Sequence, residues 1–105
     1  MRITVSHDKG RERAIRLVDE QADQLFRGMP GPVQIVDQQR RWEGDTMHFS
    51  FTGKAGFLSA PIKGTVLVED KTLTVDVELP GFLKNLMPEE KVKAGIEGRA
   101  RALLT

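Results

Sequence analysis

Strict alternation of apolar and polar residues through the middle of the chain is the feature that most limits its fold. Between Thr72 and Leu79 every second residue is a large apolar one, and stretches around Met47–Phe51 and Ile62–Val68 follow the same period. Successive side chains of a strand point to opposite faces of a sheet, so this period indicates one buried and one hydrated face. The three segments therefore predict an antiparallel sheet that needs cover on one side only.

Two further strands extend this sheet. Ile3 and Val5 mark a short one near the start of the chain, and Val33–Trp42 reads as a longer one. The apolar residues of the longer strand change parity half-way along, which a β-bulge near Asp37 explains because a bulge inserts one extra residue. Short polar segments suit hairpin turns between the strands. These segments are Glu43-Gly44-Asp45 and Glu69-Asp70-Lys71.

Two amphipathic segments predict helices at opposite ends of the chain. The first runs from about Lys9 to Phe26 with apolar residues three and four apart, and Asp8 is its expected N-cap. The second runs from about Pro88 to Leu104. Its Gly95 and Gly98 indicate either close packing against the sheet, which we favour, or a helix that frays more than the first. The order is β-α-β-β-β-β-α. The predicted fold is α+β in two layers, an antiparallel sheet of four or five strands with two helices on one face.

Length and composition indicate one domain over residues 1–105. An apolar fraction of 39% with a net charge of +1 is typical of a globular chain and unlike a disordered one. The absence of cysteine excludes disulfides and thiolate chemistry, and no apolar run reaches the roughly 20 residues of a membrane span. The near-neutral charge gives no general footprint for nucleic acid. We expect a cytoplasmic protein without metal or cofactor.

Several segments together resemble a known family. The most recognisable is Arg41–Phe49, a tryptophan, a Gly-Asp turn and an alternating strand, followed by Gly64–Val68, Leu73–Leu79, Gly81-Phe82-Leu83 and a charged C-terminal helix. In this order they resemble the putative polyhydroxyalkanoic acid system proteins. These are small bacterial proteins whose genes often accompany those of polyhydroxyalkanoate granules. The family has no established activity, so the resemblance implies granule biology without catalytic residues to carry over.

Large apolar residues outside the regular stripes are the candidate binding residues. They occur in two segments that we interpret as connectors, 55–62 between two strands and 81–88 before the last helix. If exposed, they form a patch of the kind that binds a partner. With the resemblance, they imply a non-enzymatic accessory protein that contacts granules, granule coat proteins or an acyl-like ligand. The candidate residues are Phe57, Leu58, Phe82, Leu83, Leu86 and Met87.

Two other interpretations remain open from the sequence. One is a small hydrolase or isomerase with a pocket between the sheet and the C-terminal helix, which rests on His48, Asp76 and Glu78. The other is a homo-oligomer whose interface is the free sheet face. The polar residues of that face disfavour a dry interface, and pairing through a sheet edge stays open. A nucleic-acid site at Arg40-Arg41-Trp42 is disfavoured because acidic neighbours cancel its charge. Two histidines without cysteine also disfavour a zinc site.

Overall fold

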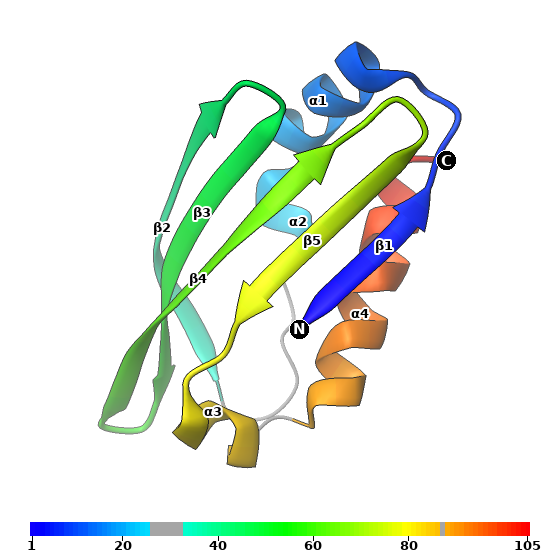
Figure 1. The fold of residues 1–105 in the computed structure, drawn as a ribbon. Coiled ribbons are helices and arrows are strands. Elements are labelled where there is room, and N and C mark those ends of the chain that lie inside the picture. The colour runs from blue at the N-terminus through cyan, green and yellow to red at the C-terminus, as the bar shows by residue number, and fades with distance from the viewer. Residues whose placement is uncertain (26–32, 87) are drawn as a thin grey trace.

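The computed structural model describes residues 1–25, 33–86 and 88–105 of the chain. One open sheet forms the front layer of Figure 1, and helices lie against one of its faces. This arrangement confirms the predicted two-layer α+β fold. The sequence pattern explains it, because the alternating strands supply a single apolar face that the helices must cover.

The sheet has five strands and is antiparallel throughout, as predicted. Its strands in chain order are β1 (Arg2–Ser6), β2 (Gln34–Glu43), β3 (Thr46–Ala55), β4 (Leu58–Val68) and β5 (Thr72–Glu78). Their order across the sheet is β1-β5-β4-β3-β2. The first strand therefore crosses to pair with the last, while β2 to β5 are consecutive hairpins. This order leaves β1 and β2 as the two edge strands.

The predicted bulge in β2 is confirmed. The pairing of β2 with β3 changes register between Val36 and Gln39, and Asp37 lies there with a φ of 56°. The extra residue restores parity, so Ile35 and Trp42 both pack against the core although they lie an odd number of residues apart. Beyond the bulge, β2 pairs regularly with β3 as far as the turn after Glu43.

The prediction of the first helix is wrong in the extent of the helix and in the residue that caps it. It divides into α1 (Arg11–Glu20) and α2 (Ala22–Leu25), and Phe26 lies outside the described residues. Gly10 rather than Asp8 occupies the N-cap, with a φ of 79° and no capping side chain. A left-handed backbone at that position suits glycine, so the chain turns into the helix two residues later than the aspartate predicts.

The C-terminal helix agrees better with the sequence. It is α4 (Glu89–Leu103), and a short α3 (Gly81–Leu86) precedes it where we predicted a connector. The predicted packing of its glycines against the sheet is wrong. A methyl group at Gly98 would meet no atom within 4 Å, and one at Gly95 would meet only the Arg99 guanidinium of the same helix, at 3.2 Å.

The close approach occurs instead at Gly64 in β4. A methyl group there would overlap the backbone carbonyl oxygen of Asp76 and the ring of Phe49. That ring stacks on Phe51 with a centroid separation of 6.0 Å. The missing side chain of Gly64 thus provides the space that the Phe49 ring fills on the apolar face of the sheet.

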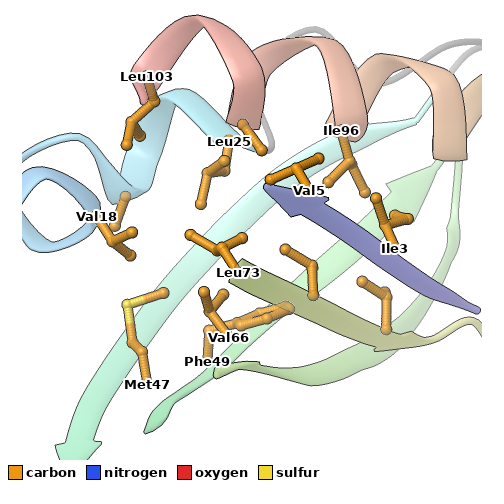
Figure 2. Close-up of a cluster of buried hydrophobic side chains, with 14 of the residues drawn as sticks. Ile3, Val5, Val18, Leu25, Met47, Phe49, Val66, Leu73, Ile96 and Leu103 are labelled. Atoms are coloured by element: carbon orange, nitrogen blue, oxygen red, sulfur yellow. The ribbon is translucent and has the colours of Figure 1, made fainter. Parts of the chain in front are cut away.

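The core lies between the sheet and helices α1, α2 and α4. Figure 2 shows Val18, Leu25, Ile96 and Leu103 descending from the helices onto side chains of the strands. Among the described residues, no polar or charged side chain is buried. The chemistry of the molecule therefore lies on its surface, on the open face of the sheet and at the ends of the strands.

Candidate functional site

The turn between β3 and β4 carries the most exposed large apolar side chain of the described residues. Gly56 and Phe57 form this turn, and Gly56 supplies the positive φ of 63° that it requires. Phe57 is 97% exposed and the adjacent Leu58 is 46% exposed. The prediction of a loop over residues 55–62 is wrong, since β3 continues to Ala55 and pairs there with Leu58.

This hairpin extends beyond the neighbouring strand. The pairing of β4 with β5 begins only at Lys63 opposite Glu78, whereas β4 itself begins at Leu58. At about 3.3 Å per residue, the tip projects roughly 16 Å past the end of β5. Figure 1 shows the hairpin at the lower left, reaching away from α1, α2 and α4. Phe57 therefore sits where another surface can reach it without rearrangement of the fold.

Helix α3 lies at the same end of the molecule in Figure 1. Its last residue, Leu86, is 37% exposed. The side chains of Phe82 and Leu83 and the whole of Met87 lie outside the described residues. We refer to Phe57, Leu58 and Leu86 as the apolar end of the molecule. These three of the six candidate residues are exposed as the binding hypothesis requires.

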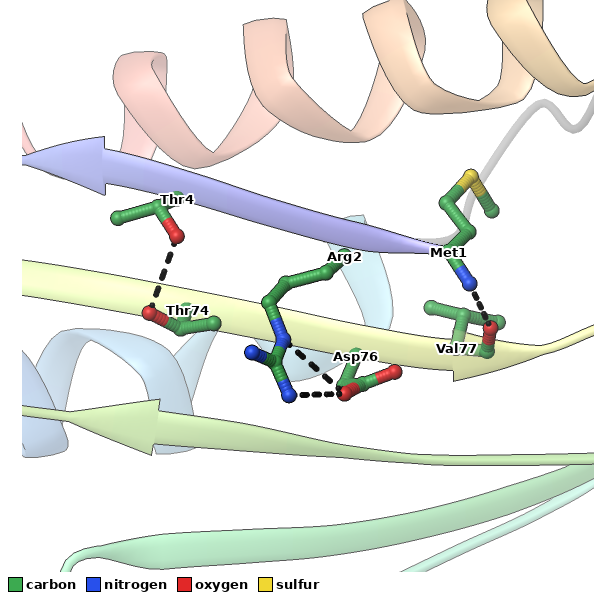
Figure 3. A network of polar contacts seen from close by, with 6 residues as sticks. All are labelled: Met1, Arg2, Thr4, Thr74, Asp76 and Val77. Atoms are coloured by element: carbon green, nitrogen blue, oxygen red, sulfur yellow. Dashed lines mark hydrogen bonds and ion pairs between the residues drawn. The ribbon is translucent and has the colours of Figure 1, made fainter.

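Polar side chains cover the open face of the sheet. One row crosses all five strands in register and contains Arg2, Asp76, Thr65, His48 and Arg41. The Arg2 guanidinium lies 3.2 Å from the Asp76 carboxylate, as Figure 3 shows. The row ends on β2, where Arg41 lies 3.2 Å from the Glu43 carboxylate. These are exposed pairs of the kind that contributes little to stability but sets the charge pattern of a surface.

The residues of the enzymatic alternative all lie on this open face. His48, Asp76 and Glu78 line a shallow depression of about 740 Å³. The pocket predicted for them, between the sheet and the C-terminal helix, is wrong because α4 covers the opposite face. One strand separates His48 from Asp76, which places their backbones about 10 Å apart. That spacing is too wide for a hydrogen-bonded acid–base pair.

A smaller depression does lie where the sheet meets the start of α4. It has a volume of about 330 Å³ and is lined by Met1, Val77, Glu78, Leu79, Lys84 and Glu89. Glu78 is the only one of the three enzymatic candidates that reaches it.

Trp42 and Arg40 point to the helix side of the sheet and meet Asp19 of α1. The indole N–H of Trp42 donates to the Asp19 carboxylate at 2.9 Å, and Arg40 lies 3.3 Å from the same oxygen. The indole hydrogen bond lowers the pKa of Asp19 most, desolvation opposes it, and the Arg40 guanidinium lowers it further. This cluster holds the long hairpin of β2 and β3 against α1, and it occupies two of the three side chains considered for nucleic-acid binding.

We expect the stability that Asp19 contributes to depend on pH. A carboxylate whose pKa is lower in the folded than in the unfolded state stabilises above the unfolded value of about 3.9, and this contribution is lost as the pH falls through the folded pKa. Asp19→Asn keeps an acceptor for the indole but removes the charge. Because half of the Asp19 side chain is exposed, we expect it to lower the free energy of unfolding by only about 0.5–1 kcal/mol at neutral pH. Urea unfolding at neutral and acidic pH measures this difference, which should vanish below the folded pKa of Asp19. A difference that persists unchanged there would contradict the assignment.

His7 is occupied by structural contacts. Its Nδ1 accepts the Lys9 backbone N–H at 3.2 Å, so Nε2 carries the proton and donates to the Glu69 carbonyl at 2.8 Å. Its own backbone N–H donates to Lys71 at 2.8 Å. These contacts tie the end of β1 to the turn between β4 and β5. Neither ring nitrogen is available as a general base in this state.

Comparison with known proteins gives one match. The family model described as "Putative polyhydroxyalkanoic acid system protein" matches residues 1–104. The chain belongs to this family. No curated protein and no solved structure matches it. The match covers both the open face and the apolar end, so it agrees with the resemblance that the sequence shows.

The description of the polyhydroxyalkanoic acid system family names no reaction, so we considered the surfaces of the molecule as places where a partner could bind. In the described part of the chain, no group of three or more His, Cys, Asp or Glu side chains is placed to hold a metal ion. No helix among those residues is long and apolar enough to cross a membrane. Sequence reasoning missed the role of Asp19, since only the fold brings α1 against β2. Leu67, which the alternation of its strand places with the polar residues, is 38% exposed on the open face.

Proposed function

We propose that this protein is a non-enzymatic, cytoplasmic accessory protein of the polyhydroxyalkanoate system that docks on the polyester surface of storage granules with its apolar end. The observation that carries the proposal is the exposure of Phe57, at 97%, on the tip of a projecting hairpin. An aromatic ring held entirely in water is unfavourable for a protein that stays alone, and it gains most from an apolar surface. The family description supports a polyhydroxyalkanoate granule as the apolar surface in question.

The expected strength of this contact follows from the area it buries. Covering a fully exposed Phe side chain is worth about 1.5–3 kcal/mol, and Leu58 and Leu86 add less because they are already partly covered. Since each 1.4 kcal/mol changes an equilibrium tenfold, the apolar end provides a reversible attachment. Phe82, Leu83 and Met87 enter the proposal from their sequence positions beside Leu86.

Two lysines flank the apolar end and are compatible with its contact with an apolar surface. Lys54 precedes the hairpin turn and Lys84 lies on α3, and both are exposed. The alkyl stem of a lysine can lie along an apolar surface while its ammonium group stays in water. Docking of this kind is driven by apolar area, so we expect it to persist at high salt, where contacts between exposed charges are screened.

The test is a sedimentation assay with protein-free polyhydroxyalkanoate granules. Purified protein is mixed with the granules, the granules are pelleted, and the bound fraction is measured at low and high salt. Binding that survives high salt is the expected result. Binding that disappears at high salt, or no binding to the bare polymer, would overturn direct apolar docking. A parallel assay with granules that keep their coat proteins then shows whether a protein on the granule is the partner.

A further inference from the structure

We propose that two copies of this chain pair through the free edge of β2, antiparallel and centred on Trp42, to form one continuous sheet. Strand β2 is last in the order of the sheet, and no other strand of the described residues lies along its outer side. Figure 1 shows the upper part of β2, which ends in its arrowhead, at the left margin of the sheet and away from α4. An edge strand presents unpaired backbone N–H and C=O groups that a second strand can satisfy.

The local geometry of β2 limits where such pairing can occur. The bulge between Val36 and Gln39 interrupts the strand at one end, and the turn at Gly44-Asp45 closes it at the other. Gln39–Glu43 is therefore the regular stretch that a second strand can follow, since a bulge bends the strand away from its neighbour. A two-fold axis at Trp42 pairs Arg41–Glu43 of one copy with the same three residues of the other.

Charge selects the register within this stretch. A two-fold axis perpendicular to the sheet keeps the two open faces on one side, so residues pair only with residues of the same face. A register centred on Arg40, Arg41 or Glu43 sets that residue opposite its own copy, with like charges face to face. The register centred on Trp42 avoids this. It sets Arg41 opposite Glu43 of the partner subunit, twice over, on either side of the axis.

These charges are already gathered at the edge. The Arg41 guanidinium lies 3.2 Å from the Glu43 carboxylate, with side chains 67% and 71% exposed. His48 Nε2 lies 3.7 Å from the same carboxylate. In the pair of subunits, the carboxylate reaches the partner's arginine across the axis and the two local pairs become one network of four charges. Several charges in a network hold their geometry better than an isolated surface pair.

The assembly has a consequence for the whole molecule. Arg41 and Gln39 line the depression on the open face, so the depressions of both subunits adjoin at the axis. Antiparallel pairing directs the two β3–β4 hairpins to opposite ends of the joined sheet. If the proposed function holds, such a dimer presents one apolar end in each direction and can bridge two granule surfaces. The pairing itself rests on β2 alone and is tested without granules.

Charge-reversal variants test the pairing. Analytical ultracentrifugation measures the dissociation constant of the wild type and of Arg41→Glu, Glu43→Arg and the double variant. Trp42 is the only tryptophan of the chain and lies at the proposed axis. Its fluorescence emission, measured over a range of protein concentrations, therefore follows the same monomer–dimer equilibrium. We expect each single variant to dissociate at least tenfold more readily, because like charges then meet across the axis. The double variant restores opposite charges and should return to within about threefold of the wild type.

A mixture of the two single variants provides the decisive control. Arg41→Glu carries two acidic residues at the axis and Glu43→Arg carries two basic ones, so an equimolar mixture should form the heterodimer although each variant alone does not. Recovery in the mixture also shows that both variants are folded. Wild type that stays monomeric at the highest soluble concentration, single variants that dimerise as well as wild type, or a mixture that stays monomeric would each overturn the proposal.

Discussion

Replacing Gly64 with alanine is expected to lower the free energy of unfolding by about 3 kcal/mol, the largest effect of any single methyl group that we predict. The added methyl group would overlap the Asp76 carbonyl oxygen and the Phe49 ring. The ring can turn only by disturbing its stack on Phe51. The carbonyl oxygen belongs to the backbone of β5, so relief there requires β4 and β5 to separate. Neither clashing group is the end of a flexible side chain, so neither can move aside at little cost.

Thermal and urea unfolding measure this effect, and Gly98→Ala is the matched control. Gly98 lies exposed in α4, and a methyl group there meets no atom within 4 Å. Alanine is favoured over glycine inside a helix by about 0.8–1 kcal/mol, so the control should be more stable than wild type. The same chemical change then gives opposite signs at two sites. Equal stability of Gly64→Ala and wild type would contradict the packing of Phe49 against β4.

Replacing Phe57 with alanine is expected to weaken granule binding about ten- to thirtyfold while leaving the stability of the fold within about 0.5 kcal/mol of wild type. The side chain is 97% exposed, so its removal takes no contact from the core. In the docked state the polymer covers this ring in the wild type. The alanine variant lacks the ring, so it buries less apolar area on docking. Titration of granules against fixed protein, followed by pelleting, gives the two binding constants.

Leu67→Ala is the control for this experiment. Leu67 is also an exposed apolar residue, at 38%, but it lies on the open face of the sheet, away from the apolar end. We expect it to bind granules as wild type does. Equal weakening by both substitutions would show that docking follows general surface hydrophobicity. A Phe57→Ala protein that binds as tightly as wild type would exclude the hairpin tip as the contact.

The sequence predicts the covered part of the sheet well because burial there imposes a period. Each inward residue of β5, such as Val75, must meet the helices, and each outward one, such as Thr74, must meet water. The bulge near Asp37 follows from the same rule, since only an extra residue brings Ile35 and Trp42 to one face. Where one face of a strand is buried and the other is hydrated, the alternation of apolar and polar residues predicts the strand directly.

The rule fails where the structure leaves both faces of a strand uncovered. The first residues of β4 at Leu58–Ala60 project beyond β5 and lack strict alternation, so they resembled a loop. The break between α1 and α2 at Gln21 and the N-cap at Gly10 are local backbone events that the apolar stripe does not record. The sequence likewise does not show that close packing occurs at Gly64 and not at Gly95 or Gly98 of α4.

The candidate site was predicted as a set of residues but not as a surface. Phe57 and Leu58 stand out in the sequence because large apolar side chains are unusual in a connecting segment. Whether such side chains fill a core or face water depends on elements far away in the chain, here on the end of β5 at Glu78. The contacts of Asp19 with Trp42 depend in the same way on how β2 lies against α1.

The most direct test of docking places an environment-sensitive fluorophore beside the apolar end. The chain contains no cysteine, so Ser59→Cys provides a unique attachment point two residues from Phe57, and Lys93→Cys provides an exposed one on α4. Addition of protein-free granules should shift the emission of the Ser59 label to the blue and leave the Lys93 label unchanged. Equal shifts at both positions, or a shift at Lys93 alone, would contradict docking through the hairpin tip.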